Sequence, residues 1–147
     1  KILQRKNAET VMAVRSADGM DELSTTCKNQ ICMLKNGTIT KMTLDPQKVG
    51  LQKGNISDIQ IRSKEDAIKS FITVLNNTAN KTKIEITALN AAGGLVISDI
   101  ADNFTDAVEL ALDTIHSGKA LDKLENFVKN HGNIEKLEDA EKLWRMF

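Results

Sequence analysis

Residues 10–22 read TVMAVRSADGMDE, and this stretch joins the first strand signal of the chain to its most concentrated acidic chemistry. The β-branched residues at its start predict a strand, and Asp18-Gly19 predicts the turn that ends it. Asp21 and Glu22 follow that turn. In open α/β sheets ligands gather beyond the carboxyl ends of strands, and neighbouring hard oxygen donors there suit magnesium held together with a substrate phosphate. Asp21 and Glu22 are therefore candidate metal ligands, although an acidic pair in a loop is more often solvated or caps a helix.

Charge and composition exclude several classes of protein. The 147 residues include 20 basic and 20 acidic side chains, so there is no basic field for nucleic acid or an anionic membrane. The apolar fraction of 41% is typical of a globular domain, no apolar run is long enough to span a bilayer, and the first residues lack the apolar segment of a secretory signal. We therefore expect a cytoplasmic protein with no nucleic-acid or membrane partner, in which Cys27 and Cys32 are reduced thiols.

A β-hairpin is the clearest local prediction. Two strand-like runs, residues 30–35 and 38–44, are separated by Asn36-Gly37, a pair that tolerates the positive φ angles of a type I′ turn. Residues 45–57 contain the only proline and are expected to form an irregular surface connection. Residues 59–61 alternate apolar and polar side chains, which predicts a further extended segment.

Helical periodicity dominates the rest of the chain. Ser63 and Asn103 each precede an amphipathic run and can cap its first turn. Residues 1–8, 119–131 and 134–147 also have helical character. Residues 83–97, rich in alanine and glycine, are expected to be buried as a strand, a helix or a transition between them. The side chains predicted to face the interior include Ile2 and Leu3, Phe71, Phe104, Phe127, and, in the last segment, Leu137, Ala140, Leu143, Trp144 and Phe147.

These elements together predict an α/β domain with one candidate acidic site. His116 and His131 stand near helix C-terminal ends and have no acidic or Cys partner at ligand spacing, so neither receives a catalytic or metal-binding role. Gly93-Gly94 has the spacing of neither a Walker loop nor a dinucleotide fingerprint, which favours a packing role. No catalytic or cofactor-binding residue is assigned.

Residues 18–26, DGMDELSTT, resemble the Asp-Gly-x-Asp-Glu-x-Ser motif of anthranilate phosphoribosyltransferase, an enzyme family of tryptophan biosynthesis. Agreement continues in order through Leu44-Asp45-Pro46, Asn90-Ala91-Ala92-Gly93-Gly94 and Ser117-Gly118-Lys119-Ala120. The resemblance implies an α/β fold with a central mixed sheet, a β-hairpin and flanking helices, as in phosphoribosyltransferase domains of the nucleoside phosphorylase and anthranilate phosphoribosyltransferase type. Residues 1–132 would then be the C-terminal part of the large α/β domain, and residues 133–147 a helical tail.

The resemblance also implies an activity. This family transfers the phosphoribosyl group of phosphoribosyl pyrophosphate to the amine of anthranilate and releases pyrophosphate. Magnesium stabilises the charge that builds on the leaving pyrophosphate, and the Asp-Glu pair of the family is associated with it. Matched residue by residue, Asp21 and Glu22 become the magnesium ligands and magnesium the expected cofactor.

The chain also departs from the family. It lacks the Gly-Thr-Gly-Gly-Asp loop that binds phosphoribosyl pyrophosphate, the Lys-His-Gly-Asn segment, and the N-terminal helical domain commonly used for dimerisation. Cys27-Lys28-Asn29 stands where the family more often has Gly-Pro or Gly-Asn. We therefore expect this chain to be inactive alone, to need the N-terminal part of the enzyme as its partner, and to belong to a homodimer when complete.

Other functions are weighed against this one. Pyrimidine nucleoside phosphorylases share the fold but should lack the acidic motif. A nucleic-acid-binding relative should have a basic face and should have lost the acidic pair, whereas this chain retains Asp21 and Glu22 and balanced charge. The main alternative is a non-catalytic α/β interaction or binding domain derived from this fold, with an incidental acidic loop.

Overall fold

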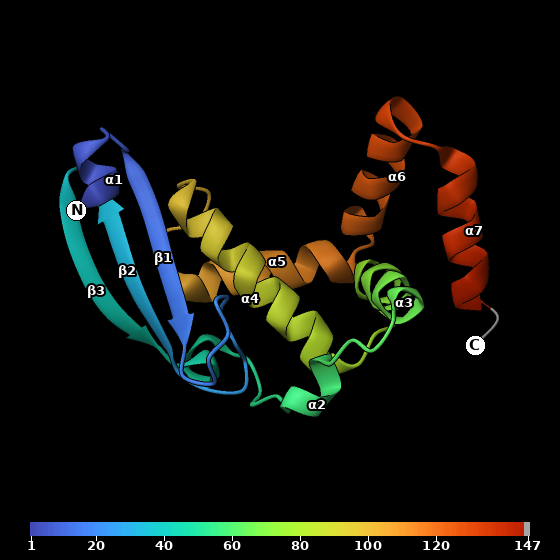
Figure 1. Cartoon of the computed structure of the whole chain (residues 1–147), viewed down its shortest axis with the longest axis horizontal. Helices are drawn as coiled ribbons and strands as arrows, with labels where there is room; N and C mark the ends of the chain where they lie inside the picture. Colours follow the sequence, from blue (N-terminus) through green and yellow to red (C-terminus); the bar gives the residue numbers. More distant parts are fainter. Residues whose placement is uncertain (146–147) are drawn as a thin grey trace.

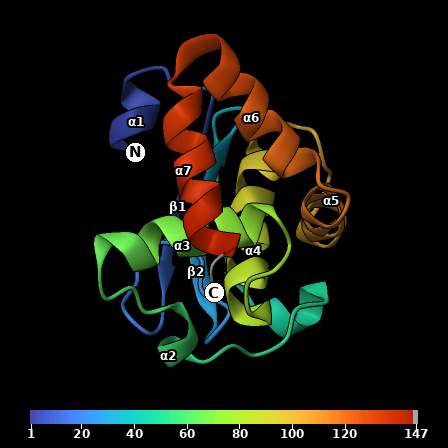
Figure 2. The same ribbon diagram turned by 90° about the vertical axis from the view of Figure 1, so that its right-hand side faces the viewer.

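The computed structural model describes residues 1–145, which form a small sheet at one end, two central helices and a cluster of helices at the other end (Figure 1). Helices α4 (Lys81–Ile97) and α5 (Phe104–His116) form the centre of the molecule. Helices α3 (Lys64–Leu75), α6 (Lys119–His131) and α7 (Ile134–Arg145) gather beyond them, and α7 crosses in front of α3 in Figure 2. Within residues 1–145, no helix is both long and apolar enough to cross a membrane.

The sheet contains β1 (Thr10–Ser16), β2 (Asn29–Lys35) and β3 (Thr38–Leu44), in that spatial order. Asn36 and Gly37 have φ angles of 51° and 75°, so the turn between β2 and β3 has the positive φ angles of the expected hairpin. The α/β class, the hairpin and the flanking helices are confirmed. Both strand pairs are antiparallel, so the expected mixed sheet is corrected to an antiparallel one within the described residues.

The connection after the hairpin is more ordered than its composition predicts. Asp45 caps a short 3-10 helix, η1 (Pro46–Val49), by accepting from the Gln47 N–H. A four-residue helix, α2 (Ile56–Ile59), follows. The extended segment predicted at residues 59–61 is wrong at Ile59, which ends a helix, whereas Gln60 has an extended backbone. No strand forms there, because a three-residue alternation is too short to define one without a neighbour to pair with.

Capping side chains define the starts of the long helices as expected. Ser63 accepts from the Asp66 N–H at 3.1 Å, and Asn103 accepts from the Asp106 N–H at 3.0 Å. The ambiguous segment at residues 83–97 is helical and lies in α4. This helix begins after its cap Asn80, which accepts from the Lys83 N–H at 2.9 Å. The cap at Asn80 is separated from the first apolar positions of the segment, so periodicity alone did not reveal it.

The main core lies between the inner face of the sheet and the α4–α5 pair. Its buried members include Leu23, Ile31, Leu44, Val49, Leu51, Leu89, Ala92, Phe104, Ala107 and Val108. A side chain on Gly93 would meet Leu23 Cδ1 at 3.4 Å and Met12 Sδ at 3.6 Å. The small residues of α4 thus allow the helix to approach β1 and the loop that follows it, as the packing interpretation of Gly93-Gly94 expects for Gly93.

The ends of the molecule are less well packed than the sequence predicts. In α1 (Ile2–Arg5) both Ile2 and Leu3 are exposed, and α6 has no buried residue. Phe71 and Phe127, predicted to face inward, are 54% and 61% exposed. In α7, Leu137 is buried and Ala140 half-buried. Phe147 lies outside the described residues, as do the side chains of Leu143 and Trp144.

Candidate acidic loop site

The candidate site is the loop between β1 and β2, residues 17–28, which leaves the sheet at the end of β1 (Figure 1). It begins after Ser16, which is buried, and it contains the acidic motif at residues 18–24. Leu23 inserts into the main core and is 2% exposed, while Ser24 and Thr25 are buried beside it. The loop is therefore attached to the core from within its own sequence.

The Asp18 carboxylate connects the beginning of the loop to its second half. Its Oδ1 accepts from the Ser16 hydroxyl and from the Met20 N–H, and its Oδ2 accepts from the Ser24 hydroxyl at 2.6 Å and from the Thr26 hydroxyl. Partial desolvation opposes the charge on Asp18, but these donors outweigh it and hold the pKa of the Asp18 carboxyl well below its usual range. Asp18 is thus a charged acceptor that draws together both ends of the loop.

Asn29 fastens the second half of the loop. Its Oδ1 accepts from the Ser24 N–H at 2.7 Å, and its Nδ2 donates to the Ser24 carbonyl at 2.9 Å and to the Cys27 carbonyl at 3.3 Å. Asn29 is fully buried, so these main-chain groups have exchanged water for the amide. The Asn29 side chain thus bonds to both main-chain groups of Ser24, as a neighbouring strand would.

Asn90 on α4 fastens the loop from outside. Its Oδ1 accepts from the Leu23 N–H at 3.0 Å, and its Nδ2 donates to the Leu23 carbonyl at 2.7 Å. Both hydrogen bonds reach the main chain directly after Glu22, and they join residues 67 positions apart in the sequence. The helix therefore fixes the position of the acidic pair relative to the core.

Asp21 and Glu22 are themselves exposed and project from this fastened loop. Neither carboxylate has an ion pair or a hydrogen bond within residues 1–145, so both keep their oxygen atoms available. The described residues contain no group of three or more His, Cys, Asp or Glu that could enclose a metal ion. Two adjacent hard oxygen donors fit a magnesium ion that keeps several waters and shares a substrate phosphate, since such sites use only one or two carboxylates.

Sequence reasoning located the acidic pair but missed the residues that hold it. Asp18 lay within the quoted motif and Asn90 began the Asn-Ala-Ala stretch, so both had a signal without a role. Asn29 had no signal apart from its place before a strand. Cys27 and Cys32 are both free thiols, as expected, and Cys27 Sγ accepts from the Asp18 N–H at 3.3 Å.

Comparison with known proteins assigns the chain to a family. The family described as "Glycosyl transferase family, a/b domain" matches residues 1–121. The chain belongs to this family. The anthranilate phosphoribosyltransferase of Nitrosopumilus maritimus is 55% identical over 138 residues, which cover 94% of this chain and 40% of the relative. The resemblance drawn from the acidic motif is thereby confirmed, and the chain spans 40% of the length of that relative.

Solved structures of anthranilate phosphoribosyltransferases have a similar fold. Anthranilate phosphoribosyltransferase from Thermus thermophilus superposes with a TM-score of 0.76 at 24% identity, covering 86% of this chain and 37% of that one. The Saccharomyces cerevisiae enzyme in complex with PRPP and Mg gives a TM-score of 0.68 at 25% identity, covering 80% of this chain and 34% of that one. Both matches cover most of the sheet-and-helix architecture described above.

Proposed function

We propose that this chain is the magnesium-binding part of an anthranilate phosphoribosyltransferase, an enzyme that transfers phosphoribosyl from phosphoribosyl pyrophosphate to anthranilate and releases pyrophosphate. The observation that carries the proposal is the two adjacent carboxylates, Asp21 and Glu22, which have no partner within residues 1–145. They lie on a loop that Asp18, Asn29 and Asn90 hold in place. The related Saccharomyces cerevisiae enzyme is known in complex with PRPP and Mg, which supports the choice of ligand.

The part assigned to this chain in the reaction is electrostatic. When bound, magnesium supplies Lewis-acid stabilisation of the charge on the departing pyrophosphate. Asp21 and Glu22 would hold the ion through oxygen atoms, directly or through water. Asn90 and Asn29 keep the main chain of Leu23 and Ser24 from moving as ligands arrive, so little reorganisation is required at the moment of reaction.

The remaining parts of the reaction are assigned to residues outside this chain. The 147 residues contain no Gly-Thr-Gly-Gly-Asp sequence, so binding of the phosphoribosyl pyrophosphate and of anthranilate is proposed to need the portion of the enzyme that the relatives have and this chain does not match. We propose that the complete enzyme is a cytoplasmic homodimer and that this chain alone has no turnover.

Reconstitution tests the proposal. The chain is mixed with the portion of the Nitrosopumilus maritimus relative that it does not match, and anthranilate consumption is measured with phosphoribosyl pyrophosphate and magnesium. We expect turnover in the mixture only, and a loss of at least about 100-fold when Asp21→Asn and Glu22→Gln are combined, as when other groups that stabilise a transition-state charge are removed. Turnover that is unchanged by the double substitution would contradict the role of Asp21 and Glu22 as metal ligands. A tight complex without turnover would favour the non-catalytic interaction domain.

A further inference from the structure

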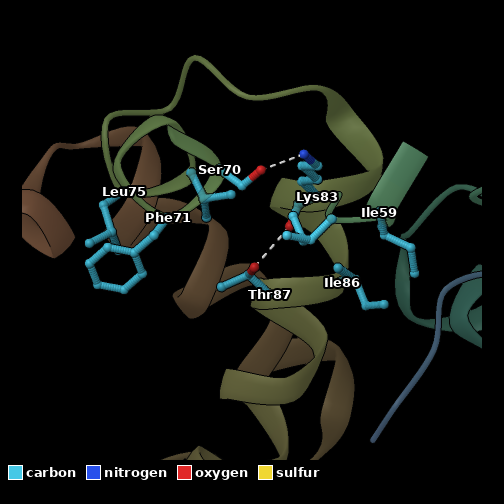
Figure 3. Close-up of a pocket in the computed structure, with 9 residues that line it drawn as sticks. Ile59, Ser70, Phe71, Leu75, Lys83, Ile86 and Thr87 are labelled. Atoms are coloured by element: carbon cyan, nitrogen blue, oxygen red, sulfur yellow. Dashed lines mark hydrogen bonds between the residues drawn. The ribbon is translucent and has the colours of Figure 1, made fainter. Parts of the chain in front are cut away.

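A hollow of about 230 Å³ lies among α2, α3 and the first turns of α4, on elements other than the acidic loop (Figure 3). Its walls are mainly aliphatic and include Ile59, Ile61, Val74, Leu75 and Ile86, with Phe71 at one side. Ile61 and Phe71 remain 48% and 54% exposed, so apolar surface faces the opening. The hollow shares no lining residue with the acidic loop.

Among the residues that line the hollow, one carries a charge, Lys83. Lys83 lines the hollow, and its Nζ donates to the Ser70 hydroxyl at 2.5 Å (Figure 3). Lys83 is only half-exposed, and among residues 1–145 no carboxylate lies within 4.0 Å of its ammonium group. A partly desolvated ammonium with one neutral acceptor retains unused donors, so an anion would gain more there than at a fully solvated lysine.

The neighbouring acidic side chains are engaged elsewhere. Asp58 on α2 accepts from the Thr82 hydroxyl at 3.1 Å. Glu85, one turn from Lys81, pairs with Lys81 at 3.6 Å and accepts from the Gln52 N–H at 2.9 Å. Within residues 1–145 neither carboxylate pairs with Lys83, and neither lines the hollow, so Lys83 places a positive charge at the edge of an apolar wall.

We propose that this hollow binds a small aliphatic carboxylate. The carboxylate accepts from Lys83 Nζ and the Ser70 hydroxyl, and the alkyl chain lies against Ile59, Ile86 and Leu75. A phosphate or a sugar would leave most of its polar atoms unpaired against this wall, while an organic cation would be repelled by Lys83. A neutral hydrocarbon would leave the ammonium group without a counter-charge.

Hexanoate is the probe for this site. We titrate the 147-residue chain with sodium hexanoate, without metal, and follow amide resonances by two-dimensional NMR. The resonances of residues around Ser70, Lys83 and Ile86 should shift with a Kd on the order of 1 mM, because a ligand of this size gains limited binding energy. Hexylammonium and hexan-1-ol should bind at least about tenfold more weakly. Equal shifts with hexan-1-ol, or no shifts around the hollow, would overturn the proposal.

Substitutions separate the charge from the wall. Lys83→Met should raise the Kd for hexanoate at least about tenfold, whereas Lys123→Met on the exposed surface of α6 removes the same charge and should leave the Kd unchanged. Ile61→Asn removes part of the wall at an exposed loop position and should also weaken binding without unfolding the chain. Unchanged affinity in Lys83→Met would overturn the proposal. Because no metal is present, these results do not depend on the function proposed for the acidic loop.

Discussion

Regular helices usually contribute more buried residues than loops do. The acidic loop, residues 17–28, and the end of the molecule formed by α3, α6 and α7 show the opposite. The loop has no regular secondary structure over residues 17–28, yet Leu23, Ser24 and Thr25 are buried, as is Asn29, the partner of Ser24. The α6 helix is regular over its whole length, yet it has no buried residue. In these two regions, burial therefore follows the insertion of Leu23 and the side chains that bond to the loop main chain, and not the presence of regular secondary structure.

The largest expected effect compares a leucine in the loop with a leucine in a helix. Leu23→Ala should lower the free energy of unfolding by about 4 kcal/mol, because Leu23 is buried among core residues and would leave a cavity. Leu124 in α6 is half-buried, so Leu124→Ala should lower the free energy of unfolding by only about 1 kcal/mol. Urea denaturation monitored by circular dichroism measures both. A larger loss of stability in Leu124→Ala than in Leu23→Ala would contradict this comparison.

The next effect concerns Asn29, whose side-chain amide bonds to the main chain of Ser24. Asn29→Ala should destabilise the chain by about 3 kcal/mol, because it leaves the Ser24 N–H and carbonyl buried without partners. Asn130→Ala is the matched control, since Asn130 is exposed and its side chain donates to the Asn126 carbonyl on its own helix, the one hydrogen bond of that side chain within residues 1–145. Its cost should be within about 0.5 kcal/mol of zero, measured by the same denaturation.

Asn90 links stability to the proposed site. Asn90→Ala should cost about 2 kcal/mol, since it releases the Leu23 N–H and carbonyl from α4. It should also weaken metal binding at Asp21 and Glu22, because the main chain beside Glu22 is no longer held. Calorimetric titration with Mn²⁺ at a temperature where the variant is folded measures the second effect. Loss of stability with unaltered affinity would show that Asn90 supports the fold alone.

The pH dependence of stability tests Asp18. The pKa of Asp18 in the folded chain is depressed, so its contribution is complete above the unfolded value of about 4 and is lost as the pH falls below that value toward the folded pKa. Asp18→Asn should therefore be less stable than the parent chain by about 1 kcal/mol at pH 7, after allowance for solvent screening. The difference should narrow at pH 3. Urea midpoints at both pH values measure it, and a constant difference would be the contrary result.

The smallest expected effect corrects a core assignment. Helical spacing places Phe71 with Ile72 and Leu75, which predicts a loss of about 3 kcal/mol on truncation to alanine. Phe71 is 54% exposed, so Phe71→Ala should cost at most about 1 kcal/mol. Thermal melting compared with Leu23→Ala measures the contrast. A loss equal to that of Leu23→Ala would mean that this face is buried in solution.

The sequence predicts best where the signal is local. The Asn36-Gly37 turn and the caps at Ser63 and Asn103 depend on neighbouring residues and are found where expected. Burial of Phe71 and Phe127 depends on how far helices approach one another, which periodicity does not report. In the site, the acidic pair was recognisable from its motif, but the bonds from Asn90 to Leu23 span 67 positions and needed the fold.

The most direct test of the account is metal binding by the acidic loop. Mn²⁺ is added in small amounts to the isotopically labelled chain, and paramagnetic broadening of the amide resonances is recorded. We predict selective broadening around Asp21 and Glu22, its loss in the combined Asp21→Asn and Glu22→Gln variant, and its retention in a combined Glu138→Gln and Asp139→Asn control on α7. Broadening that persists after the loop substitutions, or that is no stronger at the loop than at Glu138 and Asp139, would contradict the assignment of this loop as the metal site.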